Sequence, residues 1–483
     1  MFRSFYSRLI ASERYASLTI FCITAGLYVG LFFLTLVLCA AYDRDPIPSL
    51  VIMEKDPAGY ALLAKNLLEY GVITGEPEPP LMPSAYRTPG YPVFLAILLF
   101  IFRTPFAVPL AQILLSALTA VVIFKLGRRF YSLPVSLIAT LLYVLDPAAS
   151  FFSFQFMSET LFTFLFVLFL FLFTHYLAKS GGSPWSLLFL GILLGLVTLV
   201  RPITQYFAIF ALCGLFFSRR EDWRSRSFYG SILAFLLGVA LTICPWMIRN
   251  YIVGVGFQIS VVGPYAFYVY HVPQYLATKH NVAYEVERER LREKVTGGRR
   301  LSELPPDALR QKLTDVSLEA IRGDEVGFLG FYLVKTLPFL TLSSWKIPLI
   351  FYRDKIQGNP LPISDHLDVL VRGGPAKIMA LLYQRPSEWL FAVERLGRPL
   401  LFVFCLVPLW SDRGKERLVS WFLFGVILYF AILTGPLAQP RYRLPAEPSL
   451  FLLGLRGIEL MGPRLLGRGK HRGRVGQDPL EQR

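Results

Sequence analysis

The feature that most constrains this chain is a run of 25 uncharged, largely apolar residues at positions 17–41. About 20 such residues are enough to cross a bilayer as a helix, and the run is too long for the core of a signal peptide. A backbone in hydrocarbon must satisfy its own hydrogen bonds, so the segment is expected to be helical. It predicts an all-α integral membrane protein.

Nine further apolar segments bring the predicted number of membrane spans to about ten. They are 107–124, 133–147, 159–177, 185–200, 203–217, 228–247, 398–410, 418–434 and 447–461. Only 17% of the residues are charged, against roughly 25% in soluble domains. This composition excludes an ordinary soluble enzyme, a disordered chain and a small secreted module.

The distribution of Lys and Arg predicts the orientation of the chain in the membrane. Basic residues gather in the connections that share a side with the N-terminus, and the positive-inside rule places that side in the cytoplasm. They are Arg3, Arg8, Arg14, Lys125, Arg128, Arg129, Lys179, Arg219, Arg220, Arg224, Arg226, Arg413, Lys415, Arg417, Arg464, Arg468, Lys470, Arg472 and Arg474. Both termini are therefore expected in the cytoplasm. The net charge of +16 is explained by topology, and nucleic acid is not expected as a partner.

The spans divide the chain into four parts, with amphipathic helices expected in the outer-face loops. The parts are an N-terminal transmembrane module at 1–247 with a first outer loop at 42–106, an outer-face region with interfacial helices at 248–397, C-terminal transmembrane helices at 398–461, and a basic cytoplasmic tail at 462–483. A semi-apolar stretch at 326–352 is expected to be interfacial or re-entrant. If this stretch alone crossed the membrane, every later span would be inverted and the basic tail would face outward.

The first outer loop contains a candidate reactive acid. Asp56 precedes Pro57 and a stretch with leucines at helical spacing, which predicts an amphipathic helix on the membrane surface. An Asp at this position is a normal helix N-cap, and Pro is favoured at the first helical residue. The sequence leaves both roles open for Asp56.

Further polar residues occur at span ends on the same predicted outer face. Glu159 opens the fourth span beside Phe-rich sequence, where helix capping would also explain it. Five arginines share this face; they are Arg87, Arg201, Arg249, Arg441 and Arg443. For Arg87, snorkelling to lipid headgroups is the alternative to binding a lipid phosphate. Acids near a hydroxyl and arginines near a phosphate are what glycosyl transfer from a lipid phosphate requires.

These motifs together resemble the GT-C superfamily of membrane glycosyltransferases, especially its bacterial protein-mannosyltransferase-like and aminoarabinose-transferase-like branch. The resemblance extends over roughly residues 17–460. It rests on D-x-x-x-Y-x-x-x-A at Asp56, Tyr60 and Ala64, R-x-P-G-Y-P at 87–92, S-E at 158–159, R-P at 201–202, P-W-x-x-R-N at 245–250 and R-Y-R-L-P at 441–445.

The resemblance implies an enzyme that moves a sugar from a polyprenyl-phosphate-sugar donor to an acceptor on the outer face, usually with inversion. Asp56 becomes the candidate catalytic base, and Glu159 matches the second outer-face acid of the catalytic site, with a role in substrate positioning or pairing. The expected substrate- or phosphate-binding residues are Tyr60, Arg87, Arg201, Arg249, Arg441 and Arg443. Pro57 stands where many relatives have Glu.

Several alternatives stay open at this stage. Asp43-Arg44-Asp45 has the form of a metal-binding D-x-D and ranks second to Asp56 as the catalytic acid. No metal or other cofactor is predicted. The acceptor can be lipid, glycan or protein, and the other partners are membrane lipids of the inner or plasma membrane. A lipid-carrier-dependent glycan polymerase or ligase, or a lipid or glycan transporter, are the rival functions.

The predicted topology can be tested by cysteine-accessibility labelling. A cysteine introduced at Arg472 should be reached only from the cytoplasmic side, whereas cysteines in the outer loops 42–106 and 248–397 should be reached from outside. Labelling of position 472 from outside would contradict the orientation.

Overall fold

The structure is a computed structural model that describes residues 12–40, 56–179, 183–297, 306–345, 348 and 387–465. Every regular element in these ranges is a helix, which confirms the predicted all-α fold. Asp43 and Asp45 lie outside the described residues, as does the tail beyond residue 465.

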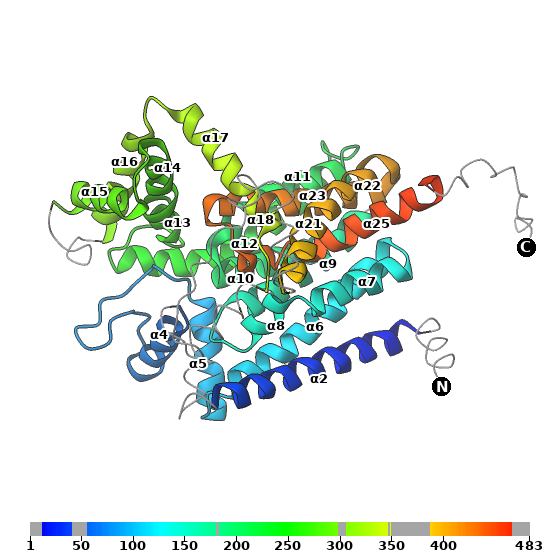
Figure 1. The fold of residues 1–483 in the computed structure, drawn as a ribbon, viewed down its shortest axis with the longest axis horizontal. Coiled ribbons are helices and arrows are strands. Elements are labelled where there is room, and N and C mark those ends of the chain that lie inside the picture. Colours follow the sequence, from blue (N-terminus) through cyan, green and yellow to red (C-terminus); the bar gives the residue numbers. More distant parts are fainter. Residues whose placement is uncertain are drawn as a thin grey trace, which may run out of the picture.

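Five helices of the described part of the chain are long and apolar enough to cross a membrane. They are α2 (Glu13–Ala40), α6 (Ala107–Phe130), α9 (Glu159–Ala178), α12 (Arg226–Ile252) and α23 (Gly414–Thr434), the last extended by η4 (Gly435–Leu437). In Figure 1, α2 and α6 run side by side along the bundle. Each covers one of the spans predicted from the sequence.

The other predicted spans fall on shorter or broken helices. These are α7 (Leu133–Val144), α10 (Pro184–Val200), η1 (Pro202–Tyr206) with α11 (Phe207–Ser218), α21 (Ser387–Phe404) with α22 (Leu406–Ser411), and α25 (Glu447–Leu465). The predicted total of ten spans therefore stays a prediction. α21 begins before residue 398, so the predicted domain boundary lies within this helix.

A sharp bend follows α7. The axis turns by 55° between α7 and α8 (Pro147–Ser153). Asp146 causes the break, because a residue before proline avoids helical backbone angles and its side chain accepts hydrogen bonds from Ala148 N and Ala149 N. The segment after the bend, α8, is a largely buried helix.

The first outer loop contains two helices, α4 (Asp56–Tyr70) and α5 (Gly90–Phe102). In Figure 1, α5 runs across the direction of α2 and α6 instead of along it. One side of α5 is buried, whereas Ile97, Phe100 and Ile101 are exposed. Exposed apolar residues on a helix of 13 residues suit the boundary between headgroups and acyl chains.

A separate group of helices follows α12 and has a small core of its own, centred on Tyr268, Val272 and Leu291. It consists of α13 (Val262–Ala266), η2 (Phe267–His271), α14 (Val272–His280), α15 (Tyr284–Thr296) and α16 (Pro306–Ile321). Figure 1 shows this group beyond one end of the bundle. α15 contains the charge-rich stretch at 285–294.

The stretch at 326–352 forms α17 (Glu325–Thr336) and α18 (Pro338–Thr341) in its described part. The two helices have 12 and 4 residues and are separated by Leu337. The interfacial or re-entrant placement of the stretch stays a prediction.

Close backbone contact joins α10 to α12. A Cβ atom added at Gly238 would lie 2.2 Å from the Leu188 carbonyl oxygen, and one added at Gly191 would lie 2.1 Å from the Phe235 carbonyl oxygen. Glycine is required at both positions, because any side chain would push the helices apart. Small residues of this kind drive helix association where the hydrophobic effect is absent.

Gly238→Val is expected to lower the midpoint of thermal unfolding in detergent by several degrees, because its side chain would overlap the α10 backbone. Gly230→Val is the matched control, since it lies in the same helix and a Cβ there meets nothing within 4 Å. Equal midpoints for the two variants would contradict the close packing.

Candidate active site

Asp56 is held between two arginines from distant parts of the chain. Its Oδ1 lies 2.7 Å from Arg87 Nη2, and its Oδ2 lies 2.9 Å from Arg441 Nη1. Asp56 opens α4, Arg87 lies in the turn before α5, and Arg441 lies in α24 (Pro440–Arg443). The Asp56 side chain is 43% exposed, so a substrate can reach it.

The two arginines also set the pKa of Asp56. Burial alone would raise this pKa, but the charges and hydrogen bonds of Arg441 and Arg87 outweigh burial and hold it below its ordinary value. Asp56 is therefore a carboxylate at neutral pH. A carboxylate stabilised in this way is a weak base for as long as both arginines remain paired with it.

Tyr60 supports this cluster one helical turn after Asp56. The Arg87 guanidinium lies 3.9 Å from the centre of the Tyr60 ring, a cation–π contact. The Tyr60 hydroxyl donates to Ser158 Oγ at 3.2 Å. Ser158 is the residue directly before Glu159, so Tyr60 connects the Asp56 cluster to the start of α9.

Glu159 forms a second, deeper ion pair. Its side chain is 2% exposed, and its Oε1 lies 2.7 Å from Arg201 Nη1. Its Oε2 is buried and has no hydrogen-bond partner among the described residues. Glu159 and Arg201 line a narrow cavity together with Arg441 and Tyr442, and Asp56 is not among the residues that line it.

Tyr442 links the two ion pairs. Arg441 Nη2 donates to the Tyr442 hydroxyl at 2.7 Å, and the Arg201 guanidinium lies 5.4 Å from the centre of the same ring. Asp56, Arg441, Tyr442, Arg201 and Glu159 therefore form one continuous polar chain. Tyr442 is not among the predicted site residues, although it lies inside the R-Y-R-L-P motif.

Arg249 has a different position from the one expected of a phosphate ligand. Its Nη1 donates to the Ser84 carbonyl at 3.1 Å and to Asn250 Oδ1 at 3.0 Å, and its guanidinium stacks on Trp246. Among the described residues, Arg249 forms no hydrogen bond or ion pair with Asp56 or Glu159. Arg249 instead fastens α12 to the loop that leads to Arg87.

Arg443 points away from the Asp56 cluster. It is 1% exposed, and it donates to Glu447 Oε1 at 2.8 Å and to the Phe339 carbonyl at 2.7 Å. It belongs to a buried ionic network that ties α8, α18, α21, α24 and α25 together. The network consists of Asp146, Ser344, Glu394, Arg398, Arg443 and Glu447.

The R-x-P-G-Y-P motif is largely structural apart from Arg87. A Cβ atom at Gly90 would lie 2.7 Å from the Leu199 carbonyl oxygen, so glycine allows α5 to approach α10. The buried Tyr91 hydroxyl donates to Gln112 Oε1 at 2.9 Å. Gly90 and Tyr91 therefore fix the place from which Arg87 reaches Asp56.

Within the described ranges, no three His, Cys, Asp or Glu side chains are grouped as metal ligands would be. The alternative acids Asp43 and Asp45 fall outside those ranges, so their position relative to Asp56 stays open.

Together these features define a helical integral membrane protein with an acid–arginine cluster at one end of its bundle. Residues 86–246 match the family described as dolichyl-phosphate-mannose-protein mannosyltransferase. The resemblance to GT-C membrane glycosyltransferases is thereby confirmed over these residues. The matched range includes Arg87, Glu159 and Arg201, but ends before Arg249 and Arg441. The comparison with curated proteins gave no match.

Two solved structures that this chain matches are distant from it in sequence. One is the archaeal oligosaccharyltransferase AglB from Archaeoglobus fulgidus, with 13% sequence identity and a TM-score of 0.48. The match covers 96% of this chain and 53% of the AglB chain. This chain therefore spans about half the length of AglB. The other is ArnT from Cupriavidus metallidurans, solved with undecaprenyl phosphate, with 12% sequence identity and a TM-score of 0.37. The match covers 92% of this chain and 79% of the ArnT chain.

The buried Glu159–Arg201 pair gives a prediction for stability. Arg201→Met should lower the free energy of unfolding by about 3–5 kcal/mol, because it leaves a buried carboxylate without its partner. The double variant Glu159→Gln with Arg201→Met should recover much of that loss. Thermal unfolding of the two single variants and the double variant measures this coupling. If the stability losses of the single variants simply add in the double variant, Glu159 and Arg201 are not a coupled pair.

Proposed function

We propose that this protein transfers a sugar from a polyprenyl-phosphate-sugar donor to a hydroxyl-bearing acceptor, with Asp56 as the base. The observation that carries the proposal is the Asp56 carboxylate held between Arg87 and Arg441 at the end of an apolar helical bundle. The family matched by residues 86–246 takes its name from a polyprenyl-type phosphate sugar, which supports this class of donor.

The two arginines have the chemistry to bind the phosphate of such a donor. Guanidinium groups bind phosphate through paired, charge-assisted hydrogen bonds. A phosphate that takes over Arg87 and Arg441 would replace the Asp56 carboxylate as their partner. Asp56 would then lose two stabilising contacts, and its basicity would rise only when a donor is present.

The transfer step follows from this exchange. The acceptor hydroxyl gives its proton to Asp56, and its oxygen forms a bond to the anomeric carbon of the sugar. The bond from that carbon to the phosphate oxygen breaks, and its electrons stay on the departing polyprenyl phosphate. Arg87 and Arg441 stabilise the charge that develops there. Attack from the side opposite the phosphate gives inversion.

Glu159 and Arg201 act as positioning residues in this proposal. Through Tyr442 they fix the Arg441 side chain, which carries half of the phosphate site. Arg249 supports the Arg87 loop through its bond to Ser84 and is not assigned to the phosphate. The predicted outer face is where the sugar would be delivered, and the acceptor is a lipid, a glycan or a protein.

Asp56→Asn tests the role of the carboxylate. Asn keeps the size and the helix-capping ability of Asp but cannot take the acceptor proton. Turnover should fall about 10²–10⁴-fold, while donor binding stays equal or tightens because a competitor for the arginines has gone. Sugar transfer and donor binding with a synthetic polyprenyl-phosphate sugar measure the two effects.

Glu69→Gln is the matched control, since Glu69 is an exposed acid of the same helix, 3.9 Å from Lys65. It should transfer sugar at the parent rate. An Asp56→Asn enzyme with normal turnover would contradict the proposed base.

The pH dependence of the reaction tests the exchange of partners. In the free enzyme the pKa of Asp56 is lowered by Arg441 and Arg87 against the effect of burial. The acidic limb of kcat/KM should therefore lie at low pH. With donor bound, the arginines face the phosphate and the pKa of Asp56 rises. The acidic limb of the pH profile of kcat should therefore lie at higher pH than that of kcat/KM. Coinciding limbs would argue against the exchange.

A further inference from the structure

A second pocket lies far from Asp56 and plays no part in the proposed reaction. It is a cavity of about 790 Å³ between α11 and α23, with the end of α9 on one side. Its inner walls are apolar and include Cys213, Phe217, Trp421 and Phe422. Phe217 and Trp421 are exposed, so the wall is continuous with the outer surface of the bundle.

Two helices place this pocket at the opposite end of the bundle from the candidate active site. Glu159 opens α9, and Leu177, near the other end of that helix, lines the pocket. α23 begins at the pocket with Gly414, and its other end leads through η4 to the helix that carries Arg441. A helix of about 20 residues is roughly 30 Å long, which is the thickness of the hydrocarbon core.

Aromatic residues mark the level of the headgroups at this end. Trp185 opens α10, Trp223 precedes α12, Trp410 lies near the end of α22, and Trp421 lies in the pocket wall. All four are exposed. Tryptophan gathers at membrane–water interfaces, so the pocket opens at the depth where lipid headgroups meet acyl chains.

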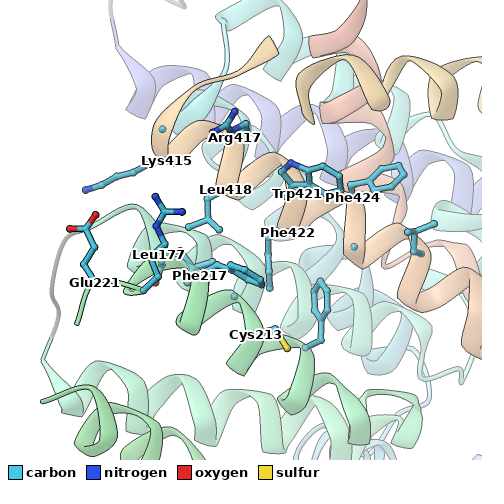
Figure 2. A pocket seen from close by; sticks show the side chains of 17 residues that line it. Leu177, Cys213, Phe217, Glu221, Lys415, Arg417, Leu418, Trp421, Phe422 and Phe424 are labelled. Carbon is cyan, nitrogen blue, oxygen red and sulfur yellow. The ribbon is translucent and has the colours of Figure 1, made fainter. Parts of the chain in front are cut away.

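The mouth of the pocket is positively charged. Arg220, Lys415 and Arg417 line it, and Glu221 is the one acid among the lining residues. Figure 2 shows Lys415, Arg417 and Glu221 towards one end, with Phe422 and Cys213 further along. The neighbouring Glu416 faces Arg456 at 3.9 Å. The mouth therefore favours an anion.

The start of α23 adds to this preference. Its N-cap residue, Arg413, makes no side-chain capping hydrogen bond. The first N–H groups of the helix therefore have no side-chain cap from Arg413, and Gly414, the first helical residue, lines the pocket. The lining thus combines basic side chains and the start of a helix with apolar walls.

We propose that this pocket binds an anionic phospholipid from the leaflet at this end of the protein. The phosphate and headgroup lie against Arg220, Lys415 and Arg417, and an acyl chain lies between α11 and α23. Basic pockets between transmembrane helices are suited to anionic headgroups, and the cytoplasmic leaflet supplies such lipids. By the positive-inside rule this end is the cytoplasmic one.

The experiment is native mass spectrometry of the full-length protein in detergent, with added dioleoyl phosphatidylglycerol or dioleoyl phosphatidylcholine. The parent protein should retain phosphatidylglycerol in preference to phosphatidylcholine. In the double variant Arg220→Gln with Arg417→Gln, the apparent affinity for phosphatidylglycerol should fall about 10- to 30-fold. Arg226→Gln is the control, because Arg226 lies at the same end but does not line the pocket.

A second variant tests the apolar chamber. Cys213→Trp places a large ring between α11 and α23 and leaves the basic mouth intact, so lipid retention should fall although the charges remain. Thermal unfolding checks that each variant is folded. Unchanged phosphatidylglycerol retention in both variants, or equal retention of phosphatidylcholine by the parent, would overturn the proposal. Displacement of phosphatidylglycerol by polyprenyl phosphate at lower concentration would assign the pocket to the carrier lipid instead.

Discussion

A hydrocarbon layer accepts charged groups only where they are paired or where they reach water, and this constraint arranges the whole molecule. Glu159 and Arg441 of the candidate site lie near helix ends, and the core between the helices contains packed rings such as those of Phe166, Phe207 and Phe430. Charges concentrated at an end of the bundle must then satisfy one another. The Asp56 cluster and the Glu159–Arg201 pair are the result at one end.

Neighbouring arginines of one short motif serve two different clusters. Arg441 and Arg443 are two positions apart in a helix, and residues with that spacing do not face the same way. Arg441 therefore reaches the partly exposed Asp56, whereas Arg443 enters the buried network with Glu447 and Arg398. The network anchors the short helix rigidly, and this fixes the direction in which Arg441 projects.

Properties that depend on local sequence were predictable. Hydropathy indicated the helical spans, and the pattern around Asp56 indicated a helix that begins there. The lateral course of α5 and the early start of α21 depend on tertiary packing, and the sequence did not indicate them. The bend at Asp146-Pro147 has a local signal, which is an acid before proline at the end of an apolar run.

The contacts of the candidate site also divide into those that local sequence indicates and those that depend on tertiary packing. The pairing of Asp56 with Arg87 joins two parts of one loop, so the sequence made it plausible. The contact with Arg441 closes a separation of 385 residues and depends on the packing of the complete bundle. Helical spacing could have shown that Arg441 and Arg443 do not serve one site. By contrast, the backbone contacts of Arg249 had no sequence signal.

The balance of charge around the cluster bears on what it binds. Arg87, Arg201 and Arg441 face only two carboxylates, Asp56 and Glu159, so this group carries a surplus of one positive charge. A partly water-exposed site with a surplus cation attracts an anion, and its field is stronger where low-dielectric walls exclude water. Asp56 limits that surplus while the site is empty, because its carboxylate occupies two of the three guanidinium groups. An anionic donor has to displace the carboxylate, and the same displacement leaves the carboxylate able to accept a proton. In the proposed reaction, binding and activation are therefore one event at Asp56, which explains why an acid with a lowered pKa can serve as the base.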